Sequence, residues 1–390
     1  MPVLAHNIKP ISIYVHWPFC LSKCPYCDFN SHVRDKIDQE QMAKALLLEI
    51  DYFATLIGKR SVKSIFFGGG TPSLMDACVV ASVIERISHH FTINDDVEIS
   101  LEANPTSVEA EKFSDFASAG INRVSLGIQA LNDTDLKALG REHCVEEALR
   151  AIEISQKYFK RSNFDLIYAR VAQSISQWED ELKKALALAN GHLSLYQLTI
   201  EKGTPFYGQW TQGKLPIPGE DLAAKMYELT NDICADHNYP AYEISNYAKL
   251  GQESRHNLSY WHYDDYLGIG AGAHGRISID GKTYATEQYK KPETWLKAVI
   301  DKGHATKIMD QLSPQIKAEE LIMMGLRLTQ GIKYADFAAK IGSDIENFMD
   351  IDRLDFLKSQ GFVDGEHSDL VRLTKRGRPL LNQILGQILT

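Results

Sequence analysis

A regular alternation of strand-length and helix-length segments over the first two hundred residues is the strongest constraint on the fold of this chain. Apolar, β-branched or aromatic runs of strand length occur at Ile11–Trp17, Val62–Phe67, Val97–Glu102, Asn122–Leu126, Asn163–Tyr168 and His192–Leu198. Segments with helical periodicity lie between them, at Asp35–Gly58, Asp76–His89, Ser107–Ala119, Val145–Lys157 and Gln177–Ala189. This alternation predicts an α/β fold with a parallel sheet, either a barrel or a doubly wound sheet, to which Ala241–Tyr247 adds a further candidate strand.

The pattern changes near residues 305–315, where a polar stretch and Pro314 precede a new helical segment. We therefore expect two domains, at residues 1–305 and 312–390. The second reads as short helices, two short strands at Phe362–Val363 and Leu370–Leu373, and a last helix, which is typical of a small winged-helix-like module. Residues 312–390 hold ten basic and eleven acidic side chains, so this module lacks the positive charge of a DNA-binding domain.

Composition and charge exclude several classes of protein. The chain has 390 residues, 51 acidic and 42 basic side chains, and a net charge of −9, which disfavours nonspecific binding to nucleic acid. No run of 18 apolar residues is present, so we expect no transmembrane segment. The first ten residues lack a signal-peptide core, which indicates a cytoplasmic protein.

Three of the six cysteines form a motif. Cys20, Cys24 and Cys27 follow the first predicted strand with the spacing Cys-x3-Cys-x2-Cys, whereas Cys78, Cys144 and Cys234 are isolated and read as ordinary thiols. Thiolates are soft ligands, and three in a short loop fit a 4Fe–4S cluster in which one iron has no protein ligand. A zinc site completed by a distant histidine, or three buried cysteines without a metal, are the alternatives that spacing leaves open.

The cysteine motif resembles that of the radical S-adenosylmethionine (SAM) enzymes, and further motifs extend the resemblance over residues 11–200. These motifs are Gly68-Gly-Gly-Thr-Pro72, Leu101-Glu-Ala-Asn-Pro105, Ser125-Leu-Gly-Ile-Gln129, Leu139-Gly-Arg141 and Phe164-Asp-Leu-Ile-Tyr168, and nearly all of their candidate residues lie at or after the carboxyl ends of predicted strands. The resemblance implies a partial (β/α) barrel and a cluster whose open iron binds SAM, which an electron then cleaves to a 5′-deoxyadenosyl radical. It implies the following SAM-site residues: Tyr14, Tyr26, Gly69, Gly70, Thr71, Glu102, Gln129, Arg141 and Asp165.

Within that superfamily, the lead-in Tyr14-x-His-x-Pro-Phe-Cys20 is similar to that of the oxygen-independent coproporphyrinogen III oxidase group. The oxidase branch carries a fourth cysteine where this chain has Phe29, and an extension before the motif, whereas only 19 residues precede Cys20. The segment His256-Asn-Leu-Ser-Tyr-Trp261 resembles the signature of the haem chaperone branch, and implies that His256 contacts haem. His274, in a glycine-rich segment that also resembles the family, is a second candidate.

The resemblance therefore favours a radical-SAM-type haem chaperone with no assigned catalytic residue. Its implied cofactors are a 4Fe–4S cluster, SAM and haem. Its implied partners are an electron donor for the cluster and haem-acceptor proteins, such as respiratory or haem-storage proteins. The alternatives are a coproporphyrinogen III dehydrogenase and a structural iron–sulfur protein. Productive cleavage of SAM, covalent attachment of haem, a homodimer and transient membrane contact all stay open.

One segment departs from the family. After Asp165-Leu-Ile-Tyr168 the family continues Gly-Leu-Pro-Gly, whereas this chain has Ala169-Arg-Val-Ala172. Glycine and proline impose particular backbone conformations, so this difference puts the shape of the pocket beside Asp165 in question.

Overall fold

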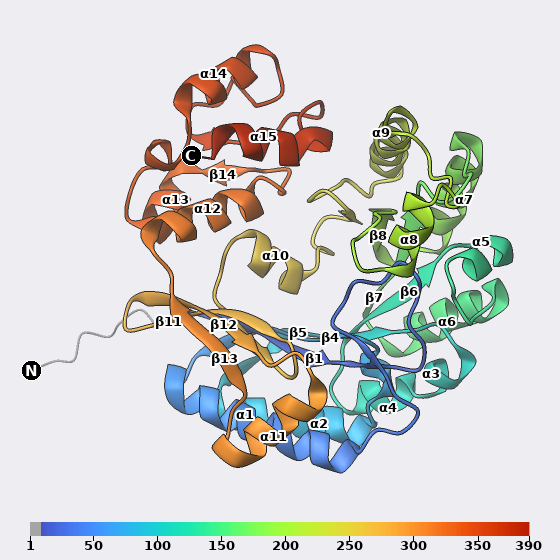
Figure 1. Cartoon of the computed structure of the whole chain (residues 1–390), viewed down its shortest axis with the longest axis vertical. Helices are drawn as coiled ribbons and strands as arrows, with labels where there is room; N and C mark the ends of the chain where they lie inside the picture. The colour runs from blue at the N-terminus through green and yellow to red at the C-terminus, as the bar shows by residue number, and fades with distance from the viewer. Residues whose placement is uncertain (1–8, 390) are drawn as a thin grey trace, which may run out of the picture.

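The computed structural model describes residues 9–389, whose central feature is an eleven-stranded mixed sheet (Figure 1). Seven parallel strands form its middle, in the order β10 (Tyr266–Ile269), β1 (Ile11–Trp17), β4 (Ser61–Gly69), β5 (Thr92–Ala103), β6 (Arg123–Gln129), β7 (Arg161–Tyr168) and β8 (Gly191–Gln197). Antiparallel strands extend both sides: β9 (Asn246–Ala248) beyond β8, and β11 (His274–Ile279), β12 (Lys282–Gln288) and β13 (Thr306–Gln311) beyond β10. Because β9 and β13 are its two edges, the sheet is an open, partial barrel, as predicted.

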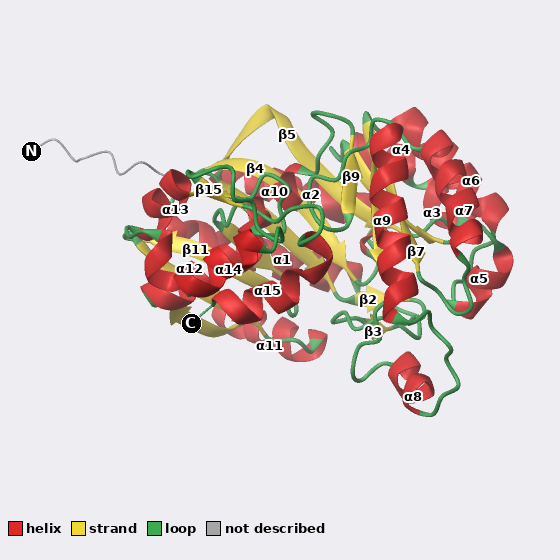
Figure 2. Ribbon diagram, turned by 90° about the horizontal axis from the view of Figure 1, so that it is seen from above, coloured by secondary structure: helices red, strands yellow, loops and turns green. Residues whose placement is uncertain are grey.

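Helices cover the outer face of this sheet (Figures 1 and 2). Their apolar sides pack on the strands in one continuous core that includes the buried residues Trp17, Phe53, Phe67, Trp178 and Trp295. The helices of this layer are α1 (Gln39–Ile57), α2 (Ala77–His90), α3 (Ser107–Glu111), α4 (Phe113–Ser118), α6 (Val145–Tyr158), α7 (Ile175–Leu188), α9 (Glu220–Asp236) and α11 (Pro292–Lys302). Short α5 (Asp133–Ala138), α8 (Pro205–Thr211) and α10 (Arg255–Trp261) lie in the connections.

The six strand predictions before residue 200 are confirmed, but the antiparallel part of the sheet was not predicted. The strand proposed at 241–247 is wrong: the structure has an isolated bridge between Ala241 and Tyr247 and a strand of three residues, β9. Strands β11 to β13 contain many half-exposed and polar residues, so they carry no strong apolar signal. Within residues 9–389, no helix is long and apolar enough to cross a membrane.

The C-terminal residues form a second, mainly helical unit with its own core. Its elements are α12 (Pro314–Gly325), β14 (Ile332–Lys333), α13 (Tyr334–Ile341), α14 (Ile351–Ser359), β15 (Leu370–Val371) and α15 (Leu381–Ile388). The predicted hairpin between 362 and 373 is reduced to one bridge, because β15 pairs with β14 instead. The boundary at 305–312 stays a prediction.

Ion pairs and hydrogen bonds connect this C-terminal unit to the barrel. Arg276 of β11 forms two short contacts with Glu320 of α12, at 2.8 and 2.7 Å. Lys340 of α13 lies 2.8 Å from Asp264. The C-terminal unit, orange to red in Figure 1, therefore packs against the end of the sheet that contains β11 and β12.

The segment that departs from the family adopts the conformation that the family glycines would favour. Ala169 and Ala172 both have a φ of 55°, in the left-handed region. Arg170 between them is buried, and its Nη2 lies 2.6 Å from Asp135 and 2.5 Å from Glu181. An ion-paired arginine thus stabilises a loop shape that is disfavoured for alanine.

We expect Ala169→Gly, or Ala172→Gly, to raise the free energy of unfolding by about 1 kcal/mol or less, because glycine removes the cost of a left-handed alanine. Ala81→Gly inside α2 is the matched control, and should lower stability by about 1 kcal/mol. Urea unfolding of the three variants measures both effects. Equal losses at positions 169 and 81 would contradict the proposed strain.

The buried carboxylate of Glu49 connects helix α1 to helix α11 and to the backbone at residues 270 and 305. Glu49 of α1 accepts hydrogen bonds from Trp295 Nε1 of α11 and from the backbone N–H groups of Gly270 and Ala305, at 2.8–3.1 Å. Burial outweighs these donors and raises the pKa of Glu49 to about 7.

This raised pKa predicts a pH-dependent stability. Between pH 4.5 and 7 the folded protein keeps a proton that the unfolded chain releases, so the contribution of Glu49 to the free energy of unfolding falls as pH rises, by about 3 kcal/mol in all. Glu49→Gln does not titrate, and its unfolding free energy should fall less steeply over this range. Urea titrations of both proteins at pH 5, 6 and 7 measure the two slopes. Parallel slopes would show that Glu49 is not the titrating group.

Candidate functional site

Two adjoining cavities lie at the carboxyl ends of the parallel strands. The smaller has a volume of about 420 Å³ and the larger about 950 Å³, near the upper end of the range for ligand pockets. Both are lined by Gly69, Glu102 and Phe29, so the two cavities share part of their wall. This is the edge of a parallel barrel at which active sites are built.

All three motif cysteines line the smaller cavity. Cys20 ends the short strand β2 (Phe19–Cys20), and Cys24 and Cys27 follow in a turn closed by the hydrogen bond from Cys27 N–H to the Cys24 carbonyl, at 3.1 Å. No three His, Cys, Asp or Glu side chains in residues 9–389 lie close enough together to hold one metal ion. What the three cysteines share is one cavity and a set of donors around their sulfurs.

Two donors point at these sulfurs. The Thr71 hydroxyl lies 3.5 Å from Cys20 Sγ, and Arg141 Nη1 lies 3.4 Å from Cys24 Sγ. A hydroxyl and a guanidinium stabilise negative charge on sulfur, which thiolate ligands carry. The donor set therefore fits cysteines that serve as thiolate ligands.

The glycine triplet lets the end of β4 approach the cysteine loop closely. A Cβ on Gly70 would lie 2.6 Å from the Phe19 carbonyl oxygen and 3.0 Å from Cys20 Sγ. Gly69 has a φ of 118°, and its N–H donates to Glu102 Oε2 at 3.1 Å. Glycine is required at both positions, for space at residue 70 and for backbone conformation at residue 69.

Two acidic residues face this space, Glu102 from β5 and Asp165 from β7, the strands on either side of β6. Burial and the nearby Asp165 raise the pKa of Glu102 to about 8. Burial raises the pKa of Asp165 to about 6, although Ser125 Oγ and Asn163 Nδ2 donate to it at 3.3 and 3.1 Å. Both carboxyl groups can therefore accept or donate hydrogen bonds near neutral pH.

Gln129 and Arg141, two further predicted residues of the SAM site, line the same cavity. Gln129 ends β6 with a φ of 75°, a left-handed strain of the kind that gathers at functional sites. Arg141 Nη2 donates to the Gly127 carbonyl and to Asn104 Oδ1, both at 2.7 Å. Asn104 lines this cavity too but was not predicted, although it belongs to the same Leu-Glu-Ala-Asn-Pro motif as Glu102.

Tyr26 lines the smaller cavity, whereas Tyr14 lines the larger one. The Tyr14 hydroxyl lies 2.9 Å from His16 Nδ1. Of the two tyrosines, only Tyr26 therefore lines the cavity that contains the cysteines.

His256 lines neither cavity. It is 1% exposed, its Nδ1 lies 2.8 Å from Ser64 Oγ, and its Nε2 lies 2.9 Å from the Tyr260 hydroxyl. Burial, and secondarily the positive charge of Arg123, lower its pKa to about 3, so the ring is neutral. Both ring nitrogens are thus engaged within the protein.

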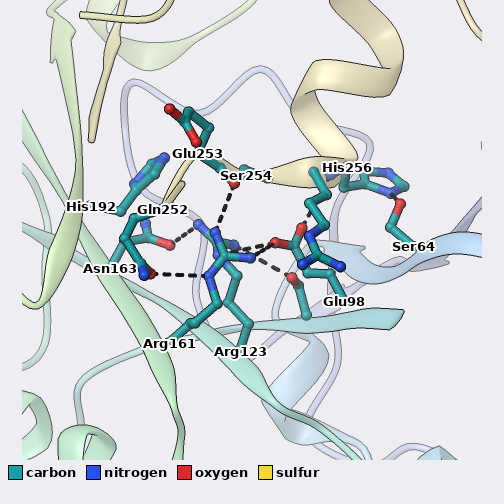
Figure 3. Close-up of polar contacts among 12 residues, drawn as sticks. Ser64, Glu98, Arg123, Arg161, Asn163, His192, Gln252, Glu253, Ser254 and His256 are labelled. Carbon is teal, nitrogen blue, oxygen red and sulfur yellow. Dashed lines mark hydrogen bonds and ion pairs between the residues drawn. The ribbon is translucent and has the colours of Figure 1, made fainter. Parts of the chain in front are cut away.

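A buried network fixes the helix that carries His256 (Figure 3). Glu98 of β5 accepts from the His256 backbone N–H at 3.1 Å and from Arg161 of β7 at 2.5 Å. Arg161 also donates to the carbonyl of Glu253, at 2.7 Å, just before α10. The start of helix α10 is therefore anchored to β5 and β7.

The larger cavity collects residues from distant parts of the chain. Its aromatic wall is made by Tyr260, Trp261 and Tyr266, while Met323 and Met324 enter it from α12 of the C-terminal unit. The two methionines were not predicted, since nothing in the local sequence of α12 indicates what lies opposite. The one indication in the sequence is that these two apolar residues are adjacent and do not belong to the buried face of α12.

A partial (β/α) barrel with three cysteines after β1 and a glycine loop after β4 defines the class of radical SAM proteins. Residues 14–185 match the family model of the radical SAM superfamily, and residues 312–380 match that of the HemN C-terminal domain. The chain belongs to this superfamily, and membership implies a 4Fe–4S cluster and SAM.

Within the superfamily, the chain belongs to the HemW family. It is 35% identical to "Heme chaperone HemW" of Haemophilus influenzae, over 98% of this chain and 99% of that protein. It is also 39% identical to "Radical S-adenosyl methionine domain-containing protein 1, mitochondrial" of Bos taurus, over 83% of this chain and 74% of that protein. The solved structure of coproporphyrinogen III oxidase (HemN) from Escherichia coli shares the fold, with a TM-score of 0.81, 22% identity, and coverage of 97% of this chain and 89% of that one.

Proposed function

We propose that this protein is a haem chaperone, which binds haem in the larger cavity and delivers it to acceptor proteins. The observation that carries this proposal is the shared wall: Gly69, Glu102 and Phe29 line both the cysteine cavity and the larger one. A ligand in the larger cavity can thus contact residues that also contact the ligand of the smaller cavity. The relatives named as haem chaperones, which match nearly the whole chain, support the same function.

We assign the smaller cavity to the cluster and SAM. Cys20, Cys24 and Cys27 would hold a 4Fe–4S cluster, with Thr71 and Arg141 stabilising the charge on its sulfur ligands. When bound, the cluster supplies an electron and an open iron for SAM. The other residues of the SAM site would be Tyr26, Gly69, Gly70, Glu102, Gln129 and Asp165, with Tyr14 nearby in the adjoining larger cavity.

The larger cavity suits a flat, mostly apolar macrocycle with two carboxylates. Tyr260, Trp261 and Tyr266 offer aromatic surface, and Lys290 offers a positive charge for a carboxylate. His256 would serve this site indirectly, by holding the Tyr260 hydroxyl through its Nε2.

Parallel assays of the cluster-reconstituted protein decide between this function and the oxidase. Under anaerobic conditions, with SAM and a reductant, we expect saturable binding of haem and no decarboxylation of coproporphyrinogen III. Formation of vinyl product at a catalytic rate would show an enzyme of porphyrin synthesis instead. The electron donor, the acceptor protein, a homodimer and a cytoplasmic location with transient membrane contact are parts of the proposal that these assays leave for separate tests.

A further inference from the structure

His274, at the start of β11, differs from the other histidines around the larger cavity. Its side chain is exposed and lines that cavity, and its ring makes no hydrogen bond to any residue between 9 and 389. His16 lines the same cavity, but its Nδ1 contacts the Tyr14 hydroxyl and its Nε2 the Asn30 carbonyl, each at 2.9 Å. His32 lines it too, although its Nε2 is buried and makes no hydrogen bond to the residues that the structure describes.

The surroundings of His274 favour its neutral form. Removal from water, together with the positive charges of Lys290 and Arg276, lowers its pKa, although Glu287 opposes them. A neutral imidazole with an accessible nitrogen is the form that ligates iron.

The position of His274 relative to the opposite wall is fixed by an ion pair. Arg276, two residues further along β11 and so on the same face, binds Glu320 of α12 through two nitrogens. Met323 and Met324 stand on the next turn of that helix and line the cavity. The strand that carries His274 and the helix that carries the methionines are therefore connected directly.

His256, by contrast, has a structural role, because both of its ring nitrogens are hydrogen-bonded within the protein. Ligation of iron by either ring nitrogen would break a buried hydrogen bond, to Ser64 or to Tyr260, and the ring stacks on Phe66 with centroids 4.9 Å apart. A buried polar group left without a partner is destabilising. Its hydrogen bond places Tyr260, whose ring meets Tyr266 edge to face at 4.6 Å. His256 thus orders the aromatic wall without entering the cavity.

We propose that His274, rather than His256, is the protein ligand of the haem iron, with the macrocycle between the aromatic wall and the methionines of α12. This inference rests on the proposed haem-binding function, and names the residue that carries it out. His256 is then a positioning residue, which acts through Tyr260.

Haem titrations of the full-length protein test the proposal, with absorbance and electron paramagnetic resonance (EPR) spectra as readouts. We expect His274→Ala to lose the ligand-dependent bands and to bind haem roughly tenfold or more weakly. Added imidazole should restore the spectrum of this variant, which shows that the fold is intact. His256→Gln should keep the spectrum of a histidine ligand, even if binding weakens. His89→Ala, on an exposed position of α2, is the matched control and should behave as the unmodified protein.

The possible outcomes distinguish the assignment of His274 as the iron ligand from the proposed haem-binding function. A normal spectrum in His274→Ala, or loss of the histidine signature only in His256→Gln or His32→Ala, would overturn His274 as the ligand while haem binding stands. Failure of the unmodified protein to bind haem would instead overturn the proposed function.

Discussion

Replacement of Cys20, Cys24 or Cys27 by alanine is expected to abolish the iron–sulfur cluster. Each thiolate would bind one iron, and the loop offers no fourth cysteine, since Phe29 stands at the position where a further one would lie. Each variant should fall from about four irons per chain to near zero after anaerobic reconstitution, and lose the broad visible absorbance of the cluster.

Cys78→Ala is the matched control, because Cys78 is exposed and lies on α2, outside both cavities. It should bind as much iron as the unmodified protein. If any single variant of the three motif cysteines kept a full cluster, the assignment of its ligands would be contradicted.

Gly70→Ala is expected to have the second largest effect, through sterics alone. The added Cβ would lie 2.6 Å from the Phe19 carbonyl oxygen and 3.0 Å from Cys20 Sγ, so the strand that ends at Cys20 must move. A shift of that size displaces one thiolate from the other two, and we expect less than about one tenth of the cluster to assemble and SAM binding to be lost.

Gly208→Ala in α8 is a suitable control, since its added Cβ meets no atom within 4 Å. Iron content, SAM binding by equilibrium dialysis, and circular dichroism should be measured together. A folded Gly70→Ala protein with a full cluster and normal SAM binding would show that the close approach is not required.

The cysteine site could be predicted from sequence because its information is local. Three cysteines in eight residues leave one strand, and Glu102, Gln129 and Asp165 each belong to a parallel strand, whose carboxyl ends must meet at one edge. The structure places all of them on one cavity. The roles of individual residues there stay predictions.

The larger cavity could not be derived in the same way. Its wall comes from α10, β10, β11 and α12, and those strands are short and partly polar, so the sequence shows neither their pairing nor what α12 covers. His256 shows the opposite case: a motif singled it out, but hydrogen bonds across 192 residues to Ser64 and across four to Tyr260 decide what its nitrogens do. Similarly, the left-handed conformation of Ala169 depends on a loop that Arg170 holds through buried ion pairs.

The most direct test of the haem chaperone function is the rate at which the haem-loaded, cluster-reconstituted protein passes haem to an apo-cytochrome b, followed by absorbance under anaerobic conditions with SAM. A chaperone that engages its acceptor predicts a transfer rate that rises with the concentration of apo-cytochrome. A rate that does not depend on the acceptor, and equals the spontaneous release of haem into solution, would contradict that function.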